Sequence, residues 1–142
     1  MNEKNECYSY FILRGEFDPV EITTRVGVPP TEFWRKGDIC PRSRRVRLFS
    51  KWSLNSRLDH GQELEAHIKD VMVQLEASRE AFAAVSEEFG GILVLVGYFN
   101  LEYPGLEFNR DITRQLAHFS LEVDFDFYWP NSRFAEDDGT KS

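Results

Sequence analysis

The sequence has little of what marks several common classes of protein. Cysteine occurs only twice, at Cys7 and Cys40, and neither lies in a Cys-x-x-Cys or Cys-x-x-His spacing, so we expect no zinc site. No apolar run reaches the roughly 18 residues that cross a bilayer, so we expect no membrane partner. The first ten residues, MNEKNECYSY, lack the apolar centre of a signal peptide, which predicts a cytoplasmic protein.

Catalytic signatures are also missing. The chain has no phosphate-binding glycine loop, no nucleophile elbow, and no triad context for its serines, cysteines or three histidines. We therefore predict no catalytic residue, no metal site and no cofactor, and we favour a protein without enzymatic activity.

Positive charge is scarce except in one stretch. The formal net charge is -7, which argues against general nucleic-acid binding. Residues 31–60 hold eight basic and three acidic side chains, a balance of +5, whereas residues 61–142 hold six basic and sixteen acidic, a balance of -10. This asymmetry is either ordinary solvated surface with weak ion pairs or a bipolar surface that orients a protein partner.

What the chain does have is enough apolar and aromatic residues for a core. It contains 142 residues, of which 42% are hydrophobic, and twelve are Phe. We expect a single α+β domain over residues 7–130. The polar residues 1–6 are expected to be flexible, and residues 131–142 are expected to form a disordered tail.

Aromatic and β-branched residues predict a strand over residues 7–14, and alternating apolar residues predict strands over 44–54 and 120–129. Residues 92–99 are apolar on both faces, which predicts a central strand. In the strand over 44–54, Val46, Leu48, Trp52 and Leu54 share one face, which predicts a half-buried strand with a basic outer face. Between the first two strands, the cap Asp18 and Pro19 begin a short helix that ends at Gly27.

The apolar spacing from Leu64 to Phe89 predicts one long helix in the middle of the chain. About 26 residues at ~1.5 Å each would span nearly 40 Å. Such a helix either kinks near Ala77 and Ser78 or overhangs the sheet and meets a second copy, which would make a homodimer. The order of the elements predicts a mostly antiparallel sheet packed on helices, in a ferredoxin-like variant.

Several short motifs carry a resemblance to a known family. They are Arg-Gly-Glu-Phe-Asp-Pro at 14–19, Pro-Thr at 30–31, Trp-Arg-Lys-Gly-Asp at 34–38, Trp52, and Leu-x-Val-Asp-Phe-Asp-x-Tyr at 121–128. Together they are similar to a small bacterial family of single-domain proteins of unknown function, over roughly Tyr8 to Tyr128. The resemblance implies a bacterial, soluble protein. It implies no reaction, because the family has no established catalytic or binding residue.

Two acidic residues on the last predicted strand are candidates for a site. Asp124 and Asp126 are two residues apart, so their side chains share a face at about 6–7 Å. Such a pair can perform acid–base chemistry or bind a hard metal ion, or it can form a solvated face that pairs with Arg14 and Lys36. We keep a hydrolase or metal-dependent enzyme as an alternative function on these carboxylates.

The second candidate is the corner formed by Trp34, Arg35 and Lys36. An indole beside two cations suits stacking on a small anionic or aromatic ligand. In the alternative, structural interpretation, Trp34 plugs the edge of the core, Gly37 permits a left-handed turn, and Asp38 accepts backbone donors.

We favour a non-enzymatic bacterial binding protein of the immunity or regulatory type. Its predicted ligand-binding residues are Trp34, Arg35, Lys36, Asp124, Asp126 and Arg14. We expect the corner at Trp34 and the acidic strand from Glu122 to Asp126 to form opposite walls of a groove.

Overall fold

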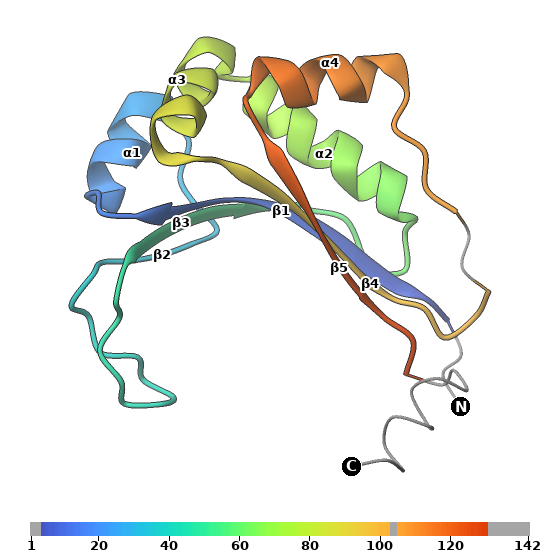
Figure 1. Cartoon of the computed structure of the whole chain (residues 1–142), viewed down its shortest axis with the longest axis horizontal. Helices are drawn as coiled ribbons and strands as arrows, with labels where there is room; N and C mark the ends of the chain where they lie inside the picture. Colours follow the sequence, from blue (N-terminus) through green and yellow to red (C-terminus); the bar gives the residue numbers. More distant parts are fainter. Residues whose placement is uncertain (1–3, 103–104, 131–142) are drawn as a thin grey trace.

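The computed structural model describes residues 4–102 and 105–130, in which a five-stranded sheet carries four helices on one face (Figure 1). The strands are β1 (Glu6–Gly15), β2 (Glu32–Trp34), β3 (Ser50–Asn55), β4 (Ile92–Tyr98) and β5 (Glu122–Tyr128). The helices are α1 (Pro19–Val26), α2 (Leu64–Glu76), α3 (Arg79–Phe89) and α4 (Arg110–His118). Residues 1–3 of the predicted flexible start and the predicted disordered tail, 131–142, lie outside the described residues.

The order of the strands across the sheet is β2-β3-β1-β4-β5. The pairs β2–β3, β3–β1 and β1–β4 are antiparallel, and β4–β5 is parallel. This confirms the predicted α+β class with a mostly antiparallel sheet on helices. The ferredoxin-like variant stays a prediction, because α4 and β5 extend the strand–helix–strand–strand–helix–strand order of that arrangement.

The prediction of one long central helix was wrong. The chain leaves the helical conformation at Ser78, whose φ and ψ are -141° and 58°, and α2 and α3 are separate helices on either side of it. The break lets α3 turn back over the sheet, so that Phe82 and Val85 are fully buried. A straight helix would instead have carried these apolar side chains past the sheet into solvent. The overhang on which we based a homodimer therefore does not exist.

The predicted strand over residues 44–54 is regular only in its second half. β3 begins at Ser50, and the segment before it belongs to a hairpin that extends away from the helices (Figure 1). Val46 and Leu48 do alternate with arginines as expected. They contact no core, however, and are 55% and 80% exposed.

The core lies between the sheet and the helices. Trp52, Phe11 and Phe82 are fully buried, and their ring centroids lie 5.7 to 6.1 Å apart, which confirms the predicted core role of Trp52. The Trp52 indole N–H donates to the Thr23 hydroxyl at 3.0 Å and so ties α1 to β3. Because successive strand residues point to opposite faces, the neighbours of these core residues lie on the face without helices.

Candidate functional site

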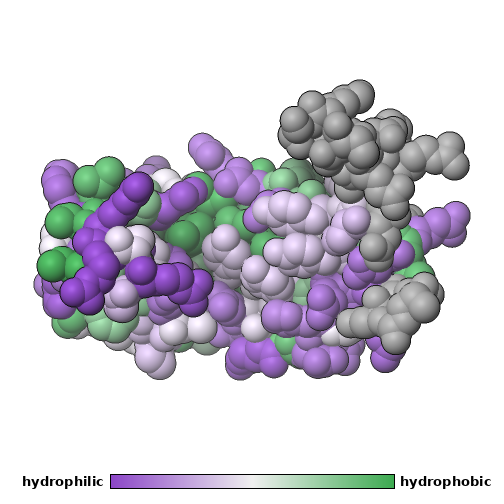
Figure 2. All heavy atoms as spheres, turned by 90° about the horizontal axis from the view of Figure 1, so that it is seen from below, coloured by the Kyte–Doolittle hydropathy of each residue, from purple (hydrophilic) through white to green (hydrophobic). Residues whose placement is uncertain are grey.

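The sheet face opposite the helices, which we call the open face, is the candidate site. Its side chains are the alternate residues Tyr8, Tyr10, Ile12 and Arg14 of β1, Val94, Val96 and Tyr98 of β4, and Glu122, Asp124, Asp126 and Tyr128 of β5. Figure 2 looks onto this face. Strongly hydrophilic residues gather at the left end, and paler and apolar residues lie across the middle.

The middle of the open face is a small apolar cluster. Ile12, Val94 and Val96 are almost completely buried, although no helix covers this side of the sheet. Tyr8 and Tyr10 pack against them, with their rings stacked at a centroid distance of 6.2 Å. The tyrosines thus shield the aliphatic side chains and present phenol groups outward, an amphipathic surface that is common at binding interfaces.

The strand register brings three of the predicted site residues together. A hollow of about 350 Å³ on the open face is lined by Tyr10, Ile12, Arg14, Val94, Asp124, Phe125 and Asp126. Tyr10 lies opposite Val94, and Val94 lies opposite Asp124, so the phenol and the carboxylate share one row across the sheet.

The hollow has opposite charges on its two sides. Arg14 comes from the middle strand β1, and Asp124 and Asp126 come from the edge strand β5. No ion pair within residues 4–102 and 105–130 joins Arg14 to a carboxylate. A bound group could therefore meet a guanidinium at one end and carboxylates at the other without first breaking an internal ion pair.

These charges change the pKa values of the tyrosines on the open face. Burial raises the pKa of Tyr10, the Asp126 carboxylate raises it further, and Arg14 opposes the effect. A hydrogen bond from the Tyr128 hydroxyl to Asp126 raises the pKa of Tyr128 to about 12. Tyr128 also stacks on Tyr98 at a centroid distance of 4.9 Å. Both phenols thus stay protonated at neutral pH and can donate hydrogen bonds.

The expected ligand platform at Trp34 is already occupied. The guanidinium carbon of Arg47 lies 3.5 Å from the centre of the indole, and the Lys51 ammonium lies 4.5 Å from it. The indole N–H donates to the Phe49 carbonyl at 3.0 Å. Trp34 is half-buried and pairs with Lys51 on the open face, so the interpretation that it plugs the core was wrong.

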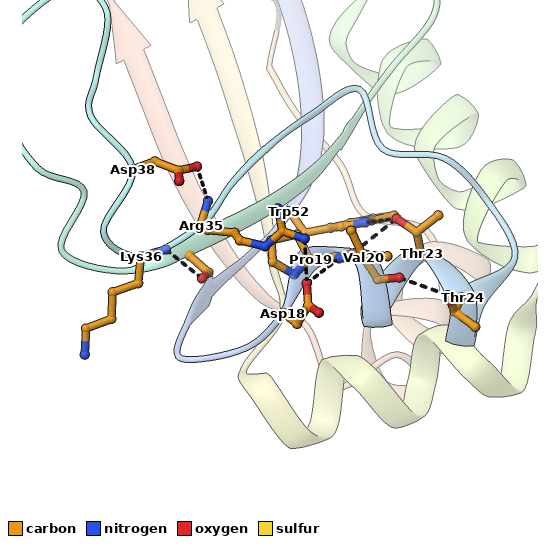
Figure 3. Close-up of polar contacts among 10 residues, drawn as sticks. Asp18, Pro19, Val20, Thr23, Thr24, Arg35, Lys36, Asp38 and Trp52 are labelled. Carbon is orange, nitrogen blue, oxygen red and sulfur yellow. Dashed lines mark hydrogen bonds and ion pairs between the residues drawn. The ribbon is translucent and has the colours of Figure 1, made fainter.

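Arg35 and Lys36 lie apart from Trp34 and reach toward the start of α1. The Arg35 guanidinium is 3.2 Å from Asp18, and the Arg35 backbone N–H donates to Asp38 at 2.8 Å (Figure 3). The Lys36 ammonium pairs with Glu16. These two cations thus hold the turn against α1. The bond from the Arg35 N–H confirms the prediction that Asp38 accepts a backbone donor in this turn.

Sequence reasoning missed the tyrosines of the open face. Tyr8 and Tyr10 alternate with the core residues Cys7, Ser9 and Phe11 along β1, and that alternation was the signal that could have found them. Tyr98 carries no such signal, because β4 is apolar on both faces, whereas the alternation of the last strand did place Tyr128 beside the carboxylates. The two rings meet because β4 and β5 are paired in parallel.

Two classes of site can be assessed directly on the described residues. No three His, Cys, Asp or Glu side chains gather there in a group that could hold a metal ion. None of the helices there combines the length and apolar composition that crossing a bilayer requires.

Fold and surface together define an α+β protein with a one-sided sheet and an aromatic, charged open face. The chain belongs to the family described as a domain of unknown function (DUF4279), whose model matches residues 5–130. No curated protein and no solved structure matches the chain. The expected membership of a family of unknown function is thus confirmed, while its motifs and the bacterial origin stay predictions.

Proposed function

We propose that the protein is a non-enzymatic interaction module that binds a partner protein on the open face of its sheet. The observation that carries this proposal is the exposed surface itself, which places tyrosines over an aliphatic floor and between the Arg14 guanidinium and the carboxylates of β5. Tyrosine and arginine are enriched at the energetic centres of protein interfaces, and a pre-formed face binds with little ordering cost. An immunity-type or regulatory protein would act through such a face by covering a surface of its partner.

The charges indicate the chemistry of the partner. Glu122, Asp124 and Asp126 form an acidic row along the edge strand, and two tyrosines supply π faces beside them. Carboxylates and phenol rings together recognise lysine and arginine side chains. Arg14, on the other side of the hollow, suits a backbone carbonyl or a carboxylate of the same segment. The partner surface is therefore expected to be a basic, extended segment.

The two alternative functions have weaker support. An enzyme using Asp124 and Asp126 as metal ligands lacks a third ligand nearby among the described residues. A small ligand stacking on Trp34 would have to displace the Arg47 guanidinium from the ring. Neither alternative has an observation in its favour that the interaction module lacks.

A photo-crosslinking amino acid at Tyr10 would test the proposal in the native cell. Position 10 lies on the open face, whereas Val73 lies on α2 and is 61% exposed, so the same amino acid at position 73 is the matched control. We expect position 10 to capture a specific protein that position 73 does not capture. That partner, once purified, should bind the wild-type chain directly.

The carboxylates supply the decisive variants. Asp124→Asn with Asp126→Asn keeps the size of both side chains and removes their charge, and we expect it to weaken binding of the purified partner about tenfold or more. Glu65→Gln with Asp111→Asn removes two exposed charges from helices and should leave binding unchanged. Equal capture from positions 10 and 73, or full binding by the Asn variant, would reject the open face as the interface.

We also infer a finer description of the fold. The first four strands follow the element order of a ferredoxin-like unit, with α2 and α3 in the place of its second helix, and α4 with β5 adds one parallel strand to its edge. An experimental structure in which β1–β4 superpose on that unit would support this description.

A further inference from the structure

The segment between β2 and β3, residues 35–49, forms a projecting hairpin, which we call the arginine hairpin. Its backbone is held by regular bonds: the Gly37 N–H donates to Arg47 at 2.8 Å, and the Arg47 N–H donates to Asp38 at 2.7 Å. Closer to the tip, the Cys40 N–H donates to Arg45 at 2.8 Å. The hairpin is therefore held by backbone hydrogen bonds from its base to its tip.

One face of the arginine hairpin is apolar and uncovered. Ile39 and Val46 lie directly opposite each other in an isolated bridge and so share a face, and Leu48 follows in the bend that leads to β3. Their exposed fractions are 63%, 55% and 80%. Three exposed aliphatic side chains are unusual for a surface hairpin, since edge hairpins normally carry charges.

The tip of the hairpin carries a cluster of arginines. No acidic residue occurs between Ile39 and Phe49, and Arg42, Arg44 and Arg45 make no ion pair with any carboxylate in the described parts of the chain. The hairpin is thus a hydrogen-bonded segment that is both basic and aliphatic. These are the properties that the open face is expected to bind.

We propose that the arginine hairpin of one copy docks on the β5 side of the open face of a second copy, forming a closed two-fold dimer. The receiving surface is complementary to the hairpin in both its charge and its apolar groups. It carries Asp124 and Asp126, and beside them the stacked aromatic rings of Tyr98 and Tyr128, which are 36% and 43% exposed. A lipid surface would also attract arginines, but a second copy is favoured because this same molecule carries the matching acidic and apolar groups.

The geometry of the molecule allows two such contacts at once. In Figure 1 the arginine hairpin and the ends of β4 and β5 both extend below the sheet, at opposite ends of its curved open face. When two open faces are opposed across a two-fold axis, the hairpin of each copy meets the β5 end of the other. An interface of this kind closes on itself and stops at two copies.

This inference rests on the proposed function in one respect, because both use the open face. A dimer would cover that face, and a basic partner segment would then have to displace the hairpin. The two proposals remain separable, since dimerisation is measured on the pure chain and partner capture is measured with position 10.

Sedimentation velocity on charge-reversed variants tests the dimer. For the wild type, we expect a concentration-dependent rise of the mass from 16.6 kDa toward twice that value. Arg42→Glu with Arg45→Glu, and separately Asp124→Lys with Asp126→Lys, should each weaken self-association about tenfold or more. An equimolar mixture of these two variants should dimerise again, because each reversed hairpin then meets a reversed face and each natural hairpin a natural one.

Two further variants separate docking from folding and from general charge effects. Leu48→Ser changes a side chain that is 80% exposed, so the monomer should keep its stability while the dimer is weakened. Arg110→Glu with Arg114→Glu reverses two charges on α4 and should leave dimerisation unchanged.

A chain that stays monomeric at every concentration would overturn the proposal, as would a dimer insensitive to both reversals. Folded variants that do not associate when mixed would also overturn it. Binding of the hairpin to phosphatidylserine vesicles by such a monomer would assign the hairpin to a lipid surface instead. If the chain dimerises but position 10 captures no partner protein, the proposed function is rejected and the dimer is retained. If the chain is monomeric but Asp124→Asn with Asp126→Asn abolishes partner binding, the dimer is rejected and the proposed function is retained.

Discussion

At the scale of single residues, Trp34 is the anchor of the arginine hairpin. Its ring contacts Arg47 and Lys51, and its N–H bonds to the Phe49 carbonyl. Exposed cation–π contacts contribute about 0.5–1 kcal/mol each and a hydrogen bond about 0.5–1.5 kcal/mol. We expect Trp34→Ala to lower the free energy of unfolding by about 1.5–3.5 kcal/mol in urea denaturation.

Trp52→Ala provides the comparison for this prediction, because truncating a fully buried tryptophan costs about 3–5 kcal/mol. Trp34→Phe keeps a ring for the two cations and should recover part of the loss. A cost for Trp34→Ala as large as that for Trp52→Ala would place Trp34 in the core after all.

Cys40, at the tip of the same hairpin, is expected to be a reactive thiol. A hydrogen bond from the Ser43 hydroxyl, together with backbone N–H groups of Ser43 and Arg42, lowers the pKa of Cys40 to about 7. Since the thiolate is the nucleophile, the rate of alkylation by iodoacetamide should rise with pH and reach half its maximum near pH 7.

Mass spectrometry of the alkylated chain can follow both cysteines in one experiment. Burial raises the pKa of Cys7, so this thiol should react slowly until the chain is unfolded. Ser43→Ala removes the hydroxyl donor and should move the midpoint for Cys40 to higher pH. An unchanged midpoint in that variant would show that the hydroxyl does not stabilise the thiolate.

At the scale of the elements, α1 depends on its cap. The Asp18 carboxylate accepts a hydrogen bond from the Val20 N–H at 3.0 Å and also pairs with Arg35. Asp18→Ala should cost about 1 kcal/mol of unfolding free energy, because the first turn of the helix loses its acceptor. Asp18→Asn keeps a capping oxygen and loses only an exposed ion pair, so it should remain close to the wild type in thermal denaturation. An equal loss in both variants would assign the effect to the ion pair.

The elements also show what local sequence could and could not predict. The cap at Asp18, the glycine stop at Gly27 and the core strands were predictable, because each depends on residues close together in the chain. The alternation of Val46 and Leu48 was real, but a period of two does not tell whether the apolar face meets a core or solvent. The break at Ser78 was open to two interpretations, since apolar spacing alone does not fix the direction of a helix.

The candidate site was predictable only in part for the same reason. Arg14, Asp124 and Asp126 were identified by residue type, but their meeting depends on the register of β1 with β4 and of β4 with β5. These pairings join residues 80 to 92 positions apart in the first case and 30 in the second, and no spacing in the sequence encodes them. The side chains of Trp34 and Arg35 point in different directions because successive residues of an extended chain alternate in direction. The short motif Trp-Arg-Lys-Gly-Asp does not reveal this difference.

At the scale of the whole molecule, His67 should make stability depend on pH. The ring is fully buried, with Nδ1 2.6 Å from the Ser56 hydroxyl and Nε2 3.1 Å from the Asp59 carbonyl. Burial lowers the pKa of His67, so the unfolded chain binds its proton at higher pH than the folded one. The free energy of unfolding is therefore expected to fall as the pH drops below the ordinary histidine range.

Urea denaturation at pH values between about 7 and 5 measures this slope. His67→Gln should flatten the slope whatever its effect on absolute stability, whereas His60→Gln, at an exposed position, should preserve it. The pKa of Asp70 is lowered by its hydrogen bond with Arg57, so its contribution is lost only at more acid pH. A slope that persists in His67→Gln would assign the acid sensitivity to other groups.

The parallel pairing of β4 and β5 has a consequence for biosynthesis. β4 is apolar on both faces and can pair with β1 as soon as it leaves the ribosome. The backbone groups on its other edge stay unpaired until α4 and β5 have been synthesised. An uncovered edge of this kind is a template for pairing with another nascent chain. Translation speed between codons 99 and 122 should therefore affect the yield of folded protein.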